Sequence, residues 1–361
     1  MNNRPSKNPA RCLVQTTAYN AEKTLRRAIE SVLNQTFTDF RYNIRDNGST
    51  DGTYDIINEY AARDSRISLT QNKLNYQILP SPKVLSSENA SPANSAAICR
   101  ATLDADDEYK PDFLARTVPF LRENNLDMVF CGSEYIQDGS SRLDTPPRTR
   151  ILENEDIIKF LPEYYQFATR YWGILYRQNI WGGLIHLITA EAGMQDSKNV
   201  LHGLEKSARI GVLAESLHKY YRAPKTLSRK YNPNWFWWVN EMYEQTRLFI
   251  LSRGPLTPEL ENFLWVRYLI WLKYILPRIQ QSDASAATKI SDIIKIFKFG
   301  RTEALMRQDW GAVGIYSDKA EFLDDCRAWL ESFTADEALR PYLEVLRGQL
   351  ASYRQDYGRR N

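Results

Sequence analysis

Short apolar runs alternate with segments of helical periodicity through the first 230 residues of the chain. Residues 12–17, 41–45 and 66–69 form short runs typical of strands, whereas residues 25–33 carry apolar side chains at helical spacing. An order of strand, helix, strand and helix predicts a mostly parallel sheet with helices on both faces. The first part of the chain is therefore predicted to be an α/β domain.

The same alternation continues as far as residue 222. Further strands are predicted at 96–103, 127–131, 171–177 and 217–222, and further helices at 111–123 and 198–208. The segment 138–149 is rich in Gly, Ser, Pro and Asp, which predicts a surface loop. Because ligands bind at the carboxyl ends of parallel strands, polar residues that follow the strands are the site candidates.

The pattern changes near residue 232, where the aromatic run Trp235–Trp238 opens a region with helical periodicity and no strand signals. Apolar residues recur at helical spacing from Leu260 to Ile275. We therefore expect an α/β domain of residues 1–232 and an all-helical domain of residues 233–361. The aromatic face of the helical domain has three interpretations: packing on the first domain, which is the default, a homodimer face, or peripheral contact with a membrane surface.

Composition excludes several classes of function. The chain has 361 residues and a net charge of +3, which gives no reason to expect a nucleic-acid partner. Its first nine residues are polar, and the apolar stretch 263–276 is too short for a membrane span and contains charged residues. The four cysteines lack metal-type spacing, and the first three, which fall in or beside predicted strands, are expected to be reduced and buried. A cytoplasmic protein is predicted, with peripheral contact at the inner face of a membrane left open.

The sequence Asp104-Ala105-Asp106-Asp107 follows the apolar-leaning run 96–103. Carboxylates packed at the end of a buried strand repel one another unless a cation or several donors neutralise them. A divalent cation, Mn²⁺ or Mg²⁺, does this and can hold a diphosphate at the same time. The alternative is a solvated acidic turn.

Two polar turns follow the first two predicted strands. In the turn 46–53, Asp46 can accept the ring N–H of uracil, thymine or guanine, which cytosine lacks. In the turn 16–20, the ring of Tyr19 can stack on a base. Both turns also have ordinary structural interpretations. The turn 46–53 can be a plain strand-to-helix turn, and Tyr19 can be a partly buried tyrosine at the start of a helix.

Several ordered motifs give the chain a family resemblance. The segments 13–20, 28–40, 46–53 and 103–107 resemble the opening strand, first helix, Asp-Gly-Ser-Thr turn and Asp-x-Asp motif of the family 2 inverting glycosyltransferases. The resemblance covers about residues 10–230 and implies a GT-A fold. It also implies transfer of a sugar from a nucleotide-diphosphate donor, a UDP-sugar above all, to a hydroxyl of a saccharide, glycan or lipid-linked saccharide.

The resemblance carries roles over position by position. Thr17 and Tyr19 match residues that hold the base, and Asp46 matches the carboxylate that binds it. Asp104 matches the first Asp of the metal motif, near the ribose and the metal, and Asp106 matches the direct metal ligand.

The general base of this family is the Asp of a Glu-Asp pair at the start of a late helix. Asp196 matches it, and Gln195 replaces the usual Glu. Inverting transfer needs one carboxylate to take the acceptor proton and no second carboxylate as nucleophile. An ordinary helix cap at Asp196 is compatible with this role, because a carboxylate is stabilised at a helix N-terminus.

Three further positions depart from the family or have two interpretations. Lys83 stands where the family has Ala-Arg-Asn, and it either supplies a cation near the phosphates or is solvated. The family histidine that follows Arg222 is absent, and Arg222 could compensate for it electrostatically. Trp172 lies where the family binds its acceptor, although a core tryptophan is commoner. The three histidines of the chain are interpreted as structural or surface residues.

Two alternatives to a glycosyltransferase stay open. A sugar-phosphate nucleotidyltransferase also uses an α/β sheet, a nucleotide and a metal, but its glycine- and arginine-rich N-terminal loop is missing. The second alternative is a non-catalytic carbohydrate- or nucleotide-binding relative of the same fold. The presence of Asp104, Asp106 and Asp196 argues against it, whereas Gln195 and the missing histidine favour it.

Overall fold

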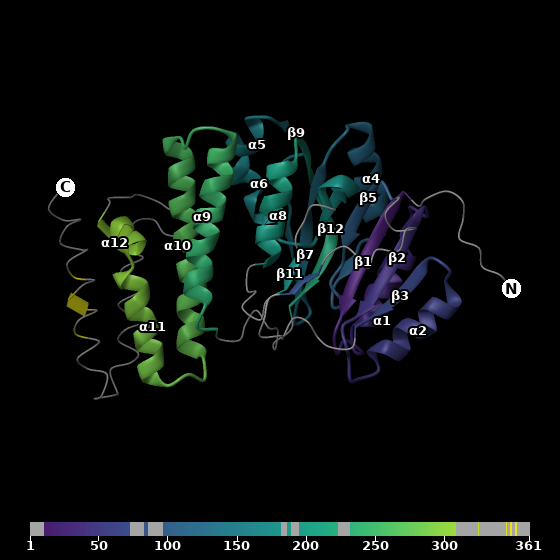
Figure 1. The fold of residues 1–361 in the computed structure, drawn as a ribbon, viewed down its shortest axis with the longest axis horizontal. Coiled ribbons are helices and arrows are strands. Elements are labelled where there is room, and N and C mark those ends of the chain that lie inside the picture. The colour runs from purple at the N-terminus through teal and green to yellow at the C-terminus, as the bar shows by residue number, and fades with distance from the viewer. Residues whose placement is uncertain are drawn as a thin grey trace. The chain divides into compact units, whose positions relative to one another are not determined.

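The computed structural model of the protein describes residues 11–72, 83–85, 97–181, 186–188, 195–222 and 232–307, with residues 324, 344, 347–348 and 351 beyond them (Figure 1). For Lys83, Gln195 and Asp196 it describes the backbone and not the side chain. The chain divides into two compact units, one of residues 1–224 with 245–255 and one of residues 225–244 with 256–361. The expected domain boundary after residue 232 stays a prediction.

The first unit is built on one twisted sheet. Its strand order is β3-β2-β1-β5-β10-β7-β12-β6, with β8 beside β7 and β9 beside β12. Along that order β10 and β6 run antiparallel to their neighbours, and the other strands are parallel to one another. The strands are β1 (Cys12–Ala18), β2 (Phe40–Asp46), β3 (Ile67–Gln71), β5 (Cys99–Thr102), β6 (Glu108–Tyr109), β7 (Met128–Gln137), β8 (Ser140–Asp144), β9 (Arg150–Glu153), β10 (Ile174–Arg177) and β12 (Arg209–Tyr221). The predicted mixed α/β fold with a mostly parallel sheet is confirmed.

Helices cover this sheet and complete its core. Helix α1 (Leu25–Leu33) buries Leu25, Ile29 and Val32 of its predicted stripe together with Ala28, whereas Leu33 is partly buried. These side chains join alternate residues of β1 and β5, such as Val14 and Ala101, in one hydrophobic cluster. The other helices are α2 (Thr53–Arg63), α4 (Phe113–Glu123), α5 (Asp156–Lys159), α6 (Leu161–Ala168), α7 (Gln178–Trp181) and α8 (Gln195–Lys206).

The predicted surface loop 138–149 is partly wrong, because β8 lies within it. Asp138 and Gly139 both have positive φ, 48° and 79°, and form the tight connection between β7 and β8. A two-residue Asp-Gly connection with this geometry matches the twist of an antiparallel pair. The strand residues 140–143 are exposed, so the segment is a surface hairpin rather than an irregular loop.

Regular structure in residues 232–307 is entirely helical, as predicted. It consists of α9 (Trp235–Arg253), α10 (Pro258–Gln281), α11 (Ala286–Lys298) and α12 (Gly300–Arg307). The predicted stripe of α10 is mostly internal, since Trp271 is partly buried and its other members are buried: Leu260, Leu264, Tyr268, Leu272 and Ile275. Among the helices that the structure describes, none combines the length and the apolar character needed to span a bilayer.

The cysteine prediction is confirmed for the described residues. Cys12, Cys99 and Cys131 are buried and free, whereas Cys326 lies outside the described residues. A small second sheet pairs β4 (Lys83–Leu85) with β11 (His186–Ile188) in antiparallel register. It brings the segment that contains Lys83 beside the segment that precedes α8.

Candidate active site

The turns that follow β1 and β2 are fastened to each other. The backbone N–H of Asn20 donates to Ser49 Oγ at 3.0 Å, and the N–H of Thr50 donates back to Asn20 Oδ1 at 2.9 Å. One step further along, the N–H of Gly52 donates to Glu22 Oε2 at 2.9 Å. Asn20 itself has φ of 49°, a left-handed conformation that asparagine tolerates better than most residues. The two candidate nucleoside turns therefore form one unit.

Asp46 ends β2 inside this unit. Its side chain is fully buried, and its two oxygens accept hydrogen bonds from the N–H of Ser49 and from Gln71 Nε2, each at 3.2 Å. A carboxylate oxygen accepts two hydrogen bonds, so Asp46 keeps capacity for another donor. Thr17 and Tyr19 are exposed at the end of β1, with 39% of Tyr19 accessible.

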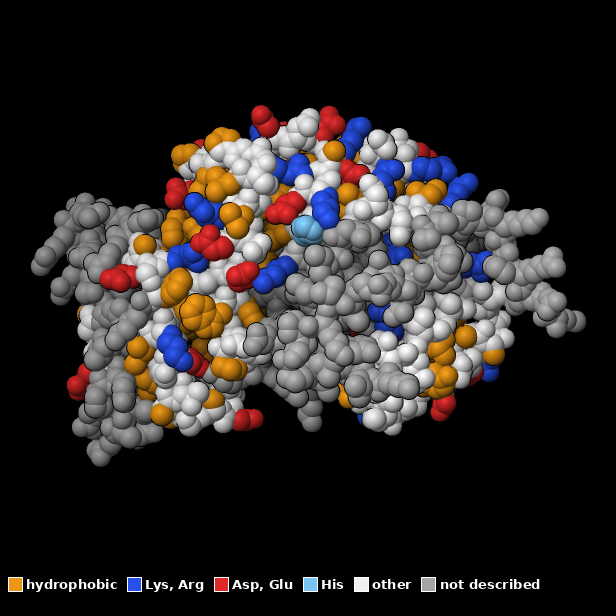
Figure 2. Space-filling model, in the orientation of Figure 1, with side chains coloured by type: hydrophobic (Ala, Val, Ile, Leu, Met, Phe, Trp, Pro, Cys, Tyr) orange, Lys and Arg blue, Asp and Glu red, His pale blue; other side chains and the backbone are white. Residues whose placement is uncertain are grey.

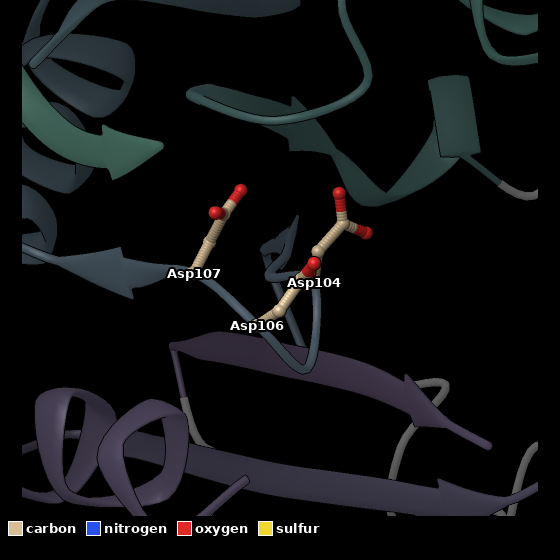
Figure 3. Close-up of side chains that lie close together, drawn as sticks. All are labelled: Asp104, Asp106 and Asp107. Carbon is tan, nitrogen blue, oxygen red and sulfur yellow. The ribbon is translucent and has the colours of Figure 1, made fainter. Parts of the chain in front are cut away.

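The acidic run forms the turn between β5 and β6. The N–H of Leu103 still bonds to the carbonyl of Gln15 on β1, at 2.9 Å, and the N–H of Asp107 then closes the turn on the carbonyl of Asp104, at 3.2 Å. Oxygens of Asp104, Asp106 and Asp107 all lie within 4.8 Å of one another, and the side chains project to the same side of the turn (Figure 3). Asp104 and Asp106 are exposed, and Asp107 is buried.

The electrostatics of this turn suit a divalent cation. Removal from water by the surrounding protein raises the pKa of Asp106, although the side chain still reaches solvent. Burial raises the pKa of Asp107 to about 8, and the negative charges of Asp106 and Glu108 add to the rise. Three close carboxylates, of which Asp106 and Asp107 have raised pKa values, form a hard oxygen donor set, which matches the ligands preferred by Mg²⁺ and Mn²⁺.

Asp107 is fastened to β12 by two contacts. Its Oδ1 accepts the backbone N–H of Tyr221 at 2.9 Å, and its Oδ2 lies 3.3 Å from His218 Nε2. On the other side of the ring, His218 Nδ1 lies 3.2 Å from Ser133 Oγ on β7. His218 and Asp107 are 0% and 1% exposed, and burial lowers the pKa of His218 to about 3. The imidazole is therefore neutral at physiological pH.

Arg27 on α1 holds the same turn from the opposite side. Its Nη2 donates to the carbonyl of Asp106 at 2.5 Å, and its Nε pairs with Glu108 Oε1 at 3.1 Å. The guanidinium also lies 3.5 Å from the centre of the Tyr221 ring, whose hydroxyl donates to Glu108 Oε1 at 2.5 Å. These contacts fix the backbone of the acidic turn between α1 and β12.

Trp172 lies beside the acidic turn and is half-buried. Its ring stacks on Tyr220 with centroids 4.8 Å apart and an angle of 17° between the planes. Burial, together with the charges of the three aspartates, raises the pKa of Tyr220 to about 12. The stacked pair thus borders the candidate metal site.

Arg222 and the start of α8 complete the set of predicted residues. Arg222 is exposed, and its guanidinium lies 5.0 Å from the centre of the Tyr135 ring, which is next to Tyr220. Gln195 and Asp196 are the first two residues of α8, and the following Ser197 donates to the carbonyl of Thr169 at 2.7 Å. This hydrogen bond anchors the first turn of α8 to Thr169, which precedes Trp172 by three residues. The side chains of Lys83, Gln195 and Asp196 lie outside what is described.

Sequence reasoning missed three residues of this arrangement. Asp107 belonged to the acidic run but received no role, and Arg27 carried no signal beyond a helical position. His218 was interpreted, with the other histidines, as structural or surface; it is buried, and it contacts the acidic turn through a strand that lies far from Asp107 in the chain. Only the position of Asp107 within the run could have indicated its place.

Comparison with known proteins finds a family resemblance in the first unit. Residues 14–183, less than half of the 361-residue chain, match the family model described as glycosyl transferase family 2. The matched segment contains both fastened turns, the acidic turn and Trp172, so the similarity covers most of the candidate site.

Related proteins carry glycosyltransferase names. The chain is 25% identical to the uncharacterized glycosyltransferase EpsJ of Bacillus subtilis over 216 residues. The aligned region covers 58% of this chain and 60% of that protein. It is 32% identical over 134 residues to the putative teichuronic acid biosynthesis glycosyltransferase TuaG of the same organism, 35% of this chain and 48% of that protein. The matches thus span less than two thirds of either relative.

A solved structure shares the fold. The structure of S. aureus TarS residues 1–349 in complex with UDP-GlcNAc aligns with a TM-score of 0.51 at 16% identity, covering 96% of this chain and 90% of that one. The likeness extends to the helical part and supports the GT-A assignment of the fold.

Proposed function

We propose that the protein is an inverting glycosyltransferase that moves a sugar from a nucleotide-diphosphate donor, a UDP-sugar, to a hydroxyl of a saccharide acceptor. The observation that carries the proposal is the cluster of Asp104, Asp106 and Asp107, whose oxygens lie within 4.8 Å of one another in the segment that matches the family 2 model. The cluster follows β5, at the same edge of the parallel sheet as the two fastened turns. Ligands bind at this edge in folds of this type.

The fastened turns would hold the nucleoside. Asp46 has a free acceptor position for the ring N–H of uracil, Thr17 offers its backbone, and the exposed ring of Tyr19 offers a stacking face. The similar fold of TarS has been solved with UDP-GlcNAc, which supports a UDP-type donor. Because the turns are bonded to each other, they would present these three groups without rearrangement.

Asp104, Asp106 and Asp107 would hold the divalent cation, Mn²⁺ or Mg²⁺. When bound, the cation supplies positive charge to the diphosphate leaving group. Arg27 holds the turn by its backbone, while His218 holds Asp107 by its carboxylate. These two residues would act by positioning, because neither is part of the carboxylate cluster. Lys83 would add a second positive charge near the phosphates.

Asp196 would act as the general base. In the transfer, the bond from the anomeric carbon to the diphosphate breaks, and a bond to the acceptor oxygen forms on the opposite face of the sugar. The acceptor proton goes to the Asp196 carboxylate, and the nucleoside diphosphate leaves. A position in the first turn of α8 favours the ionised carboxylate that this role requires.

The acceptor would bind beside Trp172, with Gln195 and Arg222 as further contacts. The exposed part of the Trp172–Tyr220 stack offers an aromatic face for a sugar ring. Among similar proteins are the chondroitin synthases of Pasteurella multocida and Escherichia coli and a teichuronic acid enzyme, which supports a role in assembling a surface polysaccharide.

The test is release of nucleotide from a panel of nucleotide sugars, with Mn²⁺ and with a chelator, in the presence of saccharide acceptors. Metal-dependent release of UDP and a product of inverted anomeric configuration by NMR are the expected results. A turnover rate that the chelator leaves unchanged, or a product with retained configuration, would contradict the proposal.

A further inference from the structure

The helical unit contains a pocket of about 260 Å³ that lies outside the segment that matches the family 2 model. It is lined by residues from the start of α9, the end of α10 and the last part of α11. All of these lining residues belong to the second unit. On the face drawn in Figure 2, hydrophobic side chains stand exposed among charged ones over the region of these helices.

One wall of the pocket is aromatic. Trp237 is 61% exposed, although tryptophan is a residue that folding normally covers. Its ring is held edge-on against Phe299, with centroids 6.4 Å apart and planes at 83°, and Phe236 meets Phe299 in the same way at 5.1 Å and 86°. The indole is thus held in a fixed orientation by its neighbours, with much of its surface available to a ligand.

Polar side chains line another part of the pocket. Asp292 is 8% exposed, and its Oδ1 accepts a hydrogen bond from Lys295 Nζ at 3.0 Å, while the Lys295 side chain is 64% exposed. Asn232 also lines the pocket, and its Oδ1 accepts the backbone N–H of Asn234 at 2.9 Å. A carboxylate, an ammonium and an amide together provide both donors and acceptors, and they carry no net charge. Such a set suits hydroxyl and amide groups better than a phosphate or an acyl chain.

We propose that this pocket binds one sugar residue of a glycan chain, as a saccharide subsite separate from the candidate catalytic centre. An exposed indole face beside hydrogen-bonding side chains matches a sugar ring, which has apolar C–H faces and a rim of hydroxyls. The pocket is slightly below the range of about 300–1,000 Å³ typical of small-molecule sites, which favours a single sugar ring over a longer segment. The inference rests on the proposed function for its ligand class, since a glycosyltransferase handles saccharide chains.

The test is direct binding by the full chain in chelator and without donor, so that no transfer occurs. The probes are tetrasaccharides of β-1,4-linked N-acetylglucosamine and of hyaluronan, followed by isothermal titration. Saturable binding of at least one probe is expected, with about tenfold weaker affinity in Trp237→Ala and in Asp292→Asn. Tyr274→Ala is the matched control, because Tyr274 is also an exposed aromatic residue, at 47%, but does not line the pocket.

The outcomes separate this inference from the proposed function. Absence of binding for every probe, or equal affinity in wild type and Trp237→Ala, would overturn the saccharide subsite, whatever the wild type does with nucleotide sugars. Retained binding in a protein that never releases nucleotide would instead overturn the proposed transfer reaction and leave the subsite standing. Unfolding midpoints of both variants show whether a loss of binding reflects a loss of structure.

Discussion

His218 Nε2 lies 3.3 Å from Asp107 Oδ2, and both side chains are almost completely shielded from solvent. The pair connects β12 to the turn that carries the other two aspartates. Residues behind a metal ligand commonly orient it through such contacts, and their loss weakens metal binding even though they never touch the ion. The contact between His218 and Asp107 therefore predicts that His218 affects metal binding.

Replacement of His218 by Asn should weaken Mn²⁺ binding by about 10- to 100-fold, because Asp107 loses the group that orients it. It should also lower the free energy of unfolding by about 1–3 kcal/mol, because a buried carboxylate loses its partner. Mn²⁺ titration followed by EPR and urea unfolding measure the two effects. His202→Asn is the control, since His202 is exposed and lies outside the acidic turn; equal metal affinity in both variants would remove the positioning role.

Substitution of the central aspartate tests the metal site itself. Asp106→Asn should abolish measurable Mn²⁺ binding at concentrations that saturate the wild type, because it removes one of three clustered carboxylates. Asp138→Asn, in the exposed β7–β8 hairpin, should bind Mn²⁺ as the wild type does. Undiminished Mn²⁺ binding in Asp106→Asn would show that the turn is a solvated acidic cluster.

The metal-free protein should become less stable as the pH rises from 6.5 to 8. The folded-state pKa of Asp107 is raised from 3.8 to about 8, so across this interval the folded protein holds a proton that the unfolded chain has lost. The pKa of His218 is lowered from 6.5 to about 3, so its opposite contribution ends near pH 6.5. From pH 6.5 to 8 the raised pKa of Asp107 therefore lowers the free energy of unfolding by about 2 kcal/mol.

Urea unfolding in chelator at several pH values, on wild type and Asp107→Asn, measures this dependence as a difference between the two proteins. The variant should lack the fall in stability between pH 6.5 and 8. Parallel curves for the two proteins would mean that Asp107 does not hold the raised pKa, and the electrostatic argument for a cation at the turn would lose its support.

The fastening of the two turns predicts an effect on the nucleotide. Asn20→Ala removes the acceptor of the Thr50 N–H and places alanine at a positive φ, which costs about 1–2 kcal/mol. UDP affinity by titration calorimetry should fall by about tenfold. Asn154→Ala imposes the same backbone strain at φ of 52° away from the turns, so it should lose similar stability and keep UDP affinity. Equal UDP affinity in the two variants would argue against the turns as the nucleoside site.

The sequence predicts the sheet and its main helices well because their apolar periodicity is local. The stripe of α1 and the stripe of α10 are mostly buried where the pattern places them. The hairpin at Asp138–Gly139 was missed because its strand, Ser140–Asp144, is exposed and lacks alternating hydrophobicity. Such a strand is specified by its turn and by its partner β7 rather than by its own pattern.

The candidate site was predictable only where it follows a motif. Asp46, Asp104 and Asp106 follow strands, and parallel strands bring such residues to one edge. Arg27 and His218 come from a helix and a strand far from the acidic turn in the chain, and no spacing rule joins them to it. Their roles depend on tertiary packing: His218 meets Asp107 after β12 pairs with β6, and Arg27 meets the Asp106 carbonyl after α1 packs beside β6.

The most direct test of the account compares wild type and Asp196→Asn for UDP release from a UDP-sugar in Mn²⁺ with a saccharide acceptor, with Glu205→Gln near the other end of α8 as the control. We predict that Asp196→Asn loses at least about a thousandfold in turnover while it binds Mn²⁺ and UDP with wild-type affinity, and that Glu205→Gln keeps most of its activity. Wild-type turnover in Asp196→Asn would contradict the assignment of the base. A wild-type protein that binds Mn²⁺ and UDP but turns over no nucleotide sugar with any acceptor would contradict the transferase itself.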